Sequence, residues 1–105
     1  MPTNGWDVYL MYANAGNAYN FKPLVFILMV AANNEVRIKT LTDGHSTLLP
    51  GEWITDGTYL YAKRQSGVIF SILPFGGNSF TDLEWVTAYP SSGTAITPIV
   101  NDSDS

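Results

Sequence analysis

The chain has a single histidine, His45, and it lies among side chains that could do acid–base chemistry. Asp43-Gly44-His45-Ser46 places an acid, a base and a hydroxyl within four residues, and these are the three groups of a Ser-His-acid hydrolase. The members of such a triad converge from separate loops on an oxyanion hole, whereas neighbours on one tight turn point in different directions. We therefore expect a polar surface turn here and no enzymatic activity.

Metal and phosphate sites also find little support in this composition. One histidine and no cysteine cannot supply the ligands of a transition-metal site. Asp43, Asp56 and Asp82 could offer carboxylates to calcium, but no loop spaces acidic ligands closely and alternately, so turn formation is their favoured role. The glycine loop at residues 75–79 has neither the lysine nor the following helix of a phosphate cradle. The sequence predicts no metal, no cofactor and no catalytic residue.

The aromatic side chains are the richer candidates for a binding surface. Tyr59 and Tyr61 are two residues apart in an expected strand, so their rings share one face of it. Such a row, with Trp53 as a third candidate, could stack on sugar rings. The same rings could be hot spots of a protein interface or part of the core. The core is the favoured interpretation, and the other two remain open.

Charge is scarce and unevenly distributed. Asp, Glu, Lys and Arg make up 13% of the chain, about half of the roughly 25% that is usual for soluble domains. Residues 1–64 balance five acids with five bases, whereas residues 65–105 hold four acids and no base, which gives the net charge of −4. A nucleic-acid binder needs a basic stripe to neutralise phosphates, so we expect no nucleic-acid partner. A surface with so little charge suits lateral association with other proteins.

The location of the protein is inferred from its apolar runs. The longest such run without a charge, residues 24–32, has nine residues, and a membrane helix needs about 20. The N-terminus lacks the basic start and the apolar stretch of a secretion signal. We expect a protein made in the cytoplasm, with no membrane partner.

Strand patterns follow one another along the chain, and no window holds the helical period for three turns. About seven or eight short strands with frequent turns predict an all-β protein, a small single-domain β-sandwich or barrel. The domain is expected over residues 1–100, followed by an acidic tail at 101–105. The expected strands are residues 6–12, 24–32, 35–41, 52–54, 58–63, 68–73, 82–89 and 94–100.

The second and third of these strands are expected to form a hairpin with a two-residue turn at Asn33-Asn34. In that register Met29 lies opposite Ile38, and Leu28 lies opposite Lys39. The first strand of the pair is apolar on both faces, so we expect it to be central or covered by another chain. The second carries Arg37 and Lys39 and is expected nearer an edge.

Residues 58–63 and 68–73 are expected to form a second hairpin across residues 64–67, followed by an irregular loop at 74–78. The last extended piece contains Pro98, which cannot donate to a ladder and confines that piece to an edge.

Three short segments are similar, in chain order, to the small head-decoration (cement) proteins of tailed phages, the lambda-type group. They are Trp-Ile-Thr-Asp-Gly at 53–57, Phe-Thr-Asp-Leu-Glu-Trp at 80–85, and Gly-Thr-Ala-Ile at 93–96 with Ile99-Val100, about seventeen residues in all. Pro98, the tail after it and the first 40 residues depart from that pattern. The resemblance implies a β-rich protein that forms a trimer on an icosahedral shell and clamps neighbouring capsid subunits.

These observations favour a non-enzymatic virion structural protein, made in the host cytoplasm, that decorates a capsid and self-associates. Its expected partners are further copies of itself and the major capsid protein or another virion protein. Two alternatives stay open, a carbohydrate-binding module that uses surface aromatics and a small host-directed inhibitor that presents the acidic C-terminal region. The expected interface residues are Ile96, Ile99, Val100, Tyr59 and Tyr61.

Overall fold

The described strands of the computed structural model form two sheets. The structure describes residues 5–15, 22–44, 48–50, 52–57, 59–63, 68–76 and 93–101, and the backbone alone of 83–86. One sheet has five strands in the order β6-β1-β2-β3-β9, and the other has four in the order β7-β5-β4-β8. The strands are β1 (Trp6–Ala15), β2 (Leu24–Ala31), β3 (Val36–Thr40), β4 (Glu52–Thr55), β5 (Leu60–Lys63), β6 (Val68–Gly76), β7 (Leu83–Val86), β8 (Thr94–Ile96) and β9 (Ile99–Val100).

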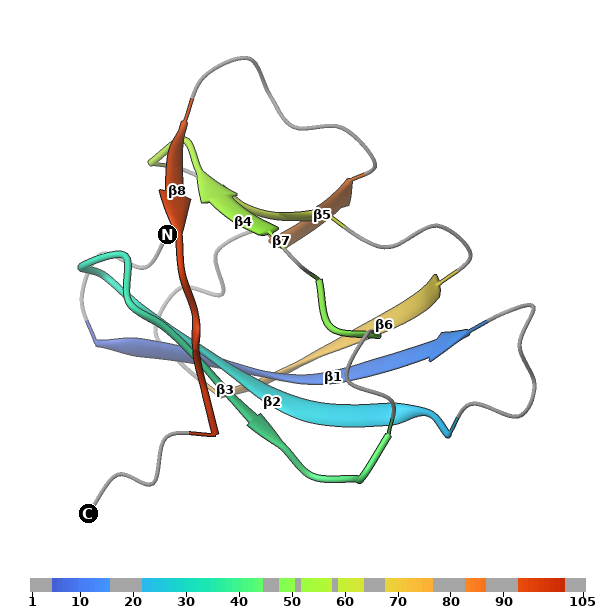
Figure 1. Cartoon of the computed structure of the whole chain (residues 1–105). Helices are drawn as coiled ribbons and strands as arrows, with labels where there is room; N and C mark the ends of the chain where they lie inside the picture. The colour runs from blue at the N-terminus through green and yellow to red at the C-terminus, as the bar shows by residue number, and fades with distance from the viewer. Residues whose placement is uncertain are drawn as a thin grey trace.

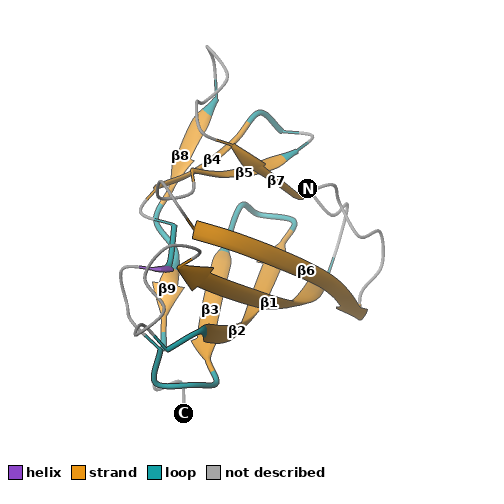
Figure 2. Cartoon of the chain, turned by 90° about the vertical axis from the view of Figure 1, so that its right-hand side faces the viewer, coloured by secondary structure: helices purple, strands orange, loops and turns teal. Residues whose placement is uncertain are grey.

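The two sheets lie one above the other and share a core (Figures 1 and 2). Alternate residues of β1, such as Tyr9 and Met11, are buried and face the second sheet, where Trp53 and Leu60 join the same cluster. This alternation follows from the two-residue period of a strand. The expected all-β class is confirmed, and the described strands have the two-layered arrangement of a sandwich. Within the described residues there is no helix of the length and apolarity needed to span a membrane.

Strand β2 is central, as its doubly apolar sequence predicts, because it lies between β1 and β3. Strand β3 is next to the edge, where it pairs in parallel with the two residues of β9. Strand β1 is longer than expected and pairs with β2 over eight residues and with β6 on its other side.

The expected register of the β2–β3 hairpin is wrong by one residue. Leu28 lies opposite Ile38, and Met29 lies opposite Arg37. The loop has three residues, because Ala31 N donates to Glu35 O at 2.9 Å and only Asn34, with φ of 65°, has a positive φ in the turn. A three-residue loop with its last residue left-handed moves the pairing by one position and exchanges the two faces of β3.

The expected hairpin of residues 58–63 and 68–73 does not form. Strand β5 pairs with β4 and β7 in the four-stranded sheet, whereas β6 pairs with β1 in the other sheet. The chain changes layers between them, because β6 finds a long apolar partner in β1. The loop expected at 74–78 is also wrong in part, since β6 runs to Gly76 with a register shift opposite Val8 and Tyr9.

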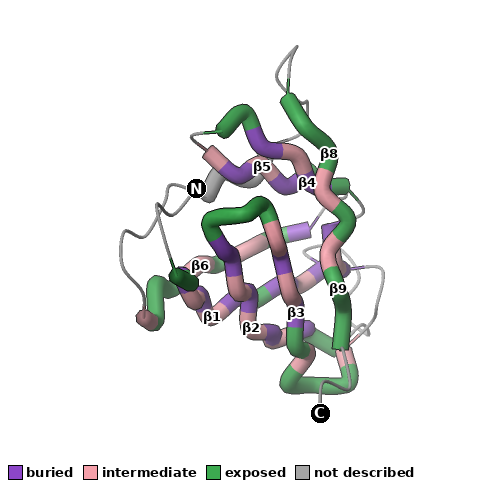
Figure 3. Tube along the Cα trace, turned by 90° about the vertical axis from the view of Figure 1, so that its left-hand side faces the viewer, coloured by how far each residue is buried: buried purple, intermediate pink, exposed green. Residues whose placement is uncertain are grey.

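Pro98 divides the last extended piece into two edge strands. Strand β8 pairs with β4 at the end of one sheet, and β9 pairs with β3 at the end of the other. Residues 97 and 98 carry the chain from one layer to the other, and most of this segment is exposed (Figure 3). The edge position expected of a proline-containing strand is confirmed.

Candidate functional site

The turn that carries the candidate triad contains groups engaged in structural contacts. Asp43 forms an exposed ion pair with Lys22, Oδ2 to Nζ at 3.3 Å. Thr42 Oγ1 donates to Pro23 O at 3.1 Å and accepts from Val25 N at 2.9 Å. Only glycine fits at position 44, because a Cβ atom there would lie 2.5 Å from Pro23 O. His45 and Ser46 lie outside the described residues, so the triad itself stays untested.

The carboxylate of Asp56 also stabilises the turn that contains it. Its Oδ1 accepts from Tyr59 N at 2.8 Å, and its Oδ2 accepts from the Tyr61 hydroxyl at 3.0 Å. Gly57, with φ of 95°, donates to Thr55 Oγ1 at 3.0 Å, and that hydroxyl donates to Tyr59 O at 2.8 Å. The described residues contain no group of three or more metal-ligating side chains, and Asp82, the third calcium candidate, lies outside them.

The tyrosine pair does not present one flat surface. The rings of Tyr59 and Tyr61 are 6.1 Å apart between centroids and tilted by 56°. Both residues are half-buried, and the Tyr61 hydroxyl is bound to Asp56. Trp53, named above as a third ring for sugars, is 2% exposed and lies in the core, so that part of the expectation is wrong. A sugar stacks best on an open, accessible ring face, and this arrangement offers little of one.

A larger candidate surface covers the side of the five-stranded sheet that is turned away from the four-stranded sheet (Figure 1). We call it the outer face. Its side chains are half-buried or exposed, alternate with the core residues, and lie beneath no described element. They are Trp6, Val8, Leu10 and Tyr12 of β1, Val25, Ile27 and Met29 of β2, Arg37 and Lys39 of β3, and Ile69, Ser71 and Leu73 of β6.

The strand register arranges these side chains in rows across the sheet. One row reads Gly76, Val8, Met29, Arg37 and Ile99 and crosses all five strands. The next reads Leu73, Leu10, Ile27 and Lys39. Both rows are therefore apolar in their middle and carry a cation on β3. In the first row Ile99 of β9 follows that cation, and the second row ends at it.

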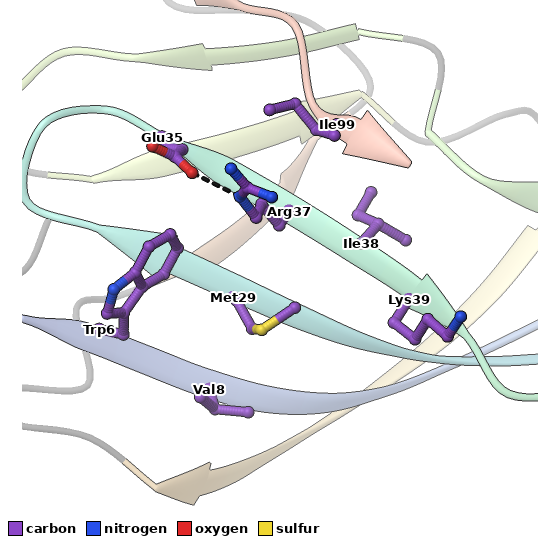
Figure 4. Close-up of a pocket in the computed structure, with 8 residues that line it drawn as sticks. All are labelled: Trp6, Val8, Met29, Glu35, Arg37, Ile38, Lys39 and Ile99. Atoms are coloured by element: carbon purple, nitrogen blue, oxygen red, sulfur yellow. Dashed lines mark hydrogen bonds and ion pairs between the residues drawn. The ribbon is translucent and has the colours of Figure 1, made fainter. Parts of the chain in front are cut away.

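A groove of about 520 Å³ lies at the β3 side of the outer face (Figure 4). Trp6, Val8 and Met29 form its apolar part, and Ile99 stands at its border on β9. The Arg37 guanidinium donates to the Glu35 carboxylate beside the groove, and both side chains are mostly shielded from solvent. Lys39 is exposed and has no ion pair with any described residue.

The residues expected at an interface fall into separate places. Ile99 and Val100 are 40% and 44% exposed, and Ile99 joins the groove. Ile96 packs against the core instead. Tyr59 and Tyr61 belong to the other layer, so the structure does not bring the five residues together.

Sequence reasoning missed the outer face because it missed the register. Two signals in the sequence point to it. Trp6, Val8, Leu10 and Tyr12 alternate with buried residues, so β1 is apolar on both faces like β2. A pair of neighbouring strands that are apolar on both faces needs cover on both.

No family model, no curated protein and no solved structure matches this chain. The surfaces of the protein itself therefore indicate its function. Of these, the outer face gathers apolar side chains from β1, β2 and β6, and such a surface is characteristic of a protein interface.

Proposed function

We propose that this chain is a non-enzymatic structural protein of a virion, which decorates a viral shell and self-associates. The observation that carries the proposal is the apolar outer face, which none of the described elements covers. Strands β1, β2 and β6 over about eight residues each, and β3 over its five, give it roughly 400–500 Å² before side-chain relief is counted, at about 4.8 Å between strands and about 3.3 Å per residue. A patch of this size on a small domain is often functional.

The composition of the outer face suits a protein partner better than a small ligand. Trp6, Tyr12, Met29 and Arg37 are of the types enriched in protein interfaces. A small-molecule site encloses most of its ligand, whereas this face is a broad side of a sheet. No catalytic residue is part of the proposal.

The assignment to a shell rests on the resemblance to head-decoration proteins, and the positions of the similar segments support it. Trp53 lies opposite Ile96, and Thr55 lies opposite Thr94, so the first and third segments are paired strands. The middle segment overlaps β7 of the same sheet at residues 83–85. The resemblance thus falls mainly on one continuous layer, the four-stranded sheet.

Sedimentation with virions tests this proposal. Particles from the source of the chain are separated on a density gradient, and the chain is quantified by mass spectrometry in each fraction. We expect it in the particle fractions at a fixed ratio to the shell protein, and a salt wash should leave that ratio unchanged. A chain found only in the soluble fractions would contradict the proposal.

A further inference from the structure

The outer face has protruding side chains along one edge and a hollow along the other. On the β6 edge, Leu73 is 57% exposed, and Phe75 at the neighbouring register shift is 73% exposed. On the β3 and β9 side lies the groove between Trp6, Met29 and Ile99. Both features stand at the same level along the strands, because one row joins Gly76 to Arg37 and the next joins Leu73 to Lys39.

We propose that a second copy of this chain covers the outer face, related to the first by a two-fold axis that runs along the strands between the two faces. The inference rests on the self-association in the proposed function and names its surface. It gives a two-fold pair, which differs from the trimer that the resemblance to head-decoration proteins implies. A rotation about this axis exchanges the β6 side with the β3 side at the same level. Protruding side chains of each copy then lie over the groove of the other, as an isologous interface requires.

The rows specify which residues meet. Leu10 of one copy lies over Ile27 of the other, and Val8 lies over Met29. Leu73 lies over Lys39, whose methylene stem can cover apolar surface while its ammonium group reaches water. Gly76 lies over Arg37 of the other copy, because the two residues are the β6 and β3 members of the same row.

Charge supports a second copy as the partner. The chain has a net charge of −4, so two copies repel each other, and the repulsion at their contact is smallest where that surface carries no acid. Among the acids whose side chains the structure describes, only Glu35 borders the outer face, and Arg37 binds it within the same copy. Asp43, Glu52 and Asp56 are bound at turns or on the four-stranded sheet.

The area is sufficient. Two faces of roughly 400–500 Å² each, with side-chain relief added, bury about 1,000 Å², which is the lower bound for a specific interface. Face-to-face packing of two sheets with nearly aligned strands is also the ordinary geometry of a sandwich.

A charge reversal tests the contact between Leu73 and Lys39. Leu73→Lys sets two ammonium groups against each other at both ends of the dimer, and we expect dimerisation to weaken at least about tenfold. Lys39→Glu added to the same chain replaces that repulsion by attraction and should restore the dimer. Thr94→Lys, on the exposed edge of the other sheet, is the control and should leave it unchanged. Native mass spectrometry and sedimentation velocity measure the association.

Cysteine cross-linking tests the same contact without a destabilising charge. The chain has no cysteine, so each introduced thiol is unique. When Lys39→Cys and Leu73→Cys proteins are mixed and oxidised, mixed disulfide dimers should exceed either homodimer. Thr94→Cys should cross-link with neither above the background.

The outcomes separate this inference from the proposed function. A chain that stays monomeric at micromolar concentration, or a dimer that Leu73→Lys leaves intact, overturns the inference. A chain that sediments with virions as a monomer overturns it too, together with the self-association in the proposed function, whereas the decoration of the shell stands. Rescue by Lys39→Glu together with preferential mixed disulfides supports the two-fold arrangement.

Discussion

Asn101 holds the end of β3 through Thr40. The Asn101 Oδ1 atom accepts a hydrogen bond from Thr40 N at 2.9 Å and another from Thr40 Oγ1 at 3.1 Å. The Asn101 backbone N–H donates to Ile38 O at 2.7 Å. With φ of 52°, Asn101 also turns the chain in the left-handed region, which asparagine adopts more readily than most residues.

The first prediction is that Asn101→Ala lowers the free energy of unfolding by about 1–3 kcal/mol. It removes the acceptor of two hydrogen bonds and places a Cβ-bearing residue without a polar side chain at positive φ. Asn101→Gly, which relieves the backbone but not the lost bonds, should cost less. Urea denaturation followed by tryptophan fluorescence measures the stability of both variants. Equal stability of the parent protein and the two variants would show that the Asn101 side chain does not stabilise the fold.

The second prediction concerns the turn between β2 and β3. Asn34→Ala should cost about 1 kcal/mol, because glycine, asparagine and aspartate adopt a φ of 65° far more readily than alanine does. Asn33→Asp should be nearly neutral, since the aspartate keeps the oxygen that accepts from Glu35 N at 3.2 Å. A two-residue turn needs positive φ at both positions. Asn33→Ala loses this hydrogen bond but should carry no further penalty from its backbone conformation. If its loss of unfolding free energy, after the hydrogen bond is subtracted, equals that of Asn34→Ala, the three-residue loop is wrong.

This turn also shows how far the sequence could predict the fold. The apolar pattern of residues 24–32 correctly predicts a central strand, and Pro98 correctly predicts edge positions. The faces of β3 could not be predicted, because Asn33-Asn34 fits both a two-residue and a three-residue loop. One residue more in the loop moves Arg37 from the expected partner Val30 to Met29, and the position of the outer face depends on that step.

The pairing of β6 was predicted wrongly for another reason. Residues 58–63 and 68–73 read as neighbouring strands with a short connection, and such strands usually pair. The alternative partner of β6, strand β1, is more than 50 residues earlier in the chain. No local pattern reports a contact at that separation, so the candidate groove and the protruding Leu73 could not be placed together from the sequence.

The third prediction compares two tryptophans. Trp53→Ala should lower the free energy of unfolding by about 3–5 kcal/mol, because its indole lies in the core. Trp6→Ala, on the outer face, should cost the monomer far less, since Trp6 is exposed. Chemical denaturation monitored by circular dichroism compares them. Equal losses would mean that Trp6 is covered within its own chain.

The fourth prediction concerns the tyrosine turn. Asp56→Ala should cost about 1–2 kcal/mol, because it removes the acceptor for both Tyr59 N and the Tyr61 hydroxyl. Tyr61→Phe loses one of these bonds and should cost less. We also expect neither variant to change retention on polysaccharide columns. Retention of the parent protein that disappears in Tyr61→Phe would favour the carbohydrate-binding alternative.

The last prediction separates the two halves of the C-terminal segment. Deleting residues 99–105 removes β9, which pairs at only two positions of β3 and has exposed side chains. The truncated chain should therefore fold, with the loss of the Asn101 bonds, but Ile99 no longer borders the groove, so self-association should weaken.

Deleting residues 95–105 removes in addition Ala95 and Ile96, which pair with β4, and the Ile96 side chain that packs against the core. We expect this longer deletion to cost at least about 1.5–3 kcal/mol more, the contribution of one buried aliphatic side chain. Thermal unfolding and sedimentation velocity of the two deletions provide the test. If the shorter deletion abolishes folding, β9 belongs to the core of the monomer, and if it associates like the full chain, the groove at Ile99 takes no part in the dimer.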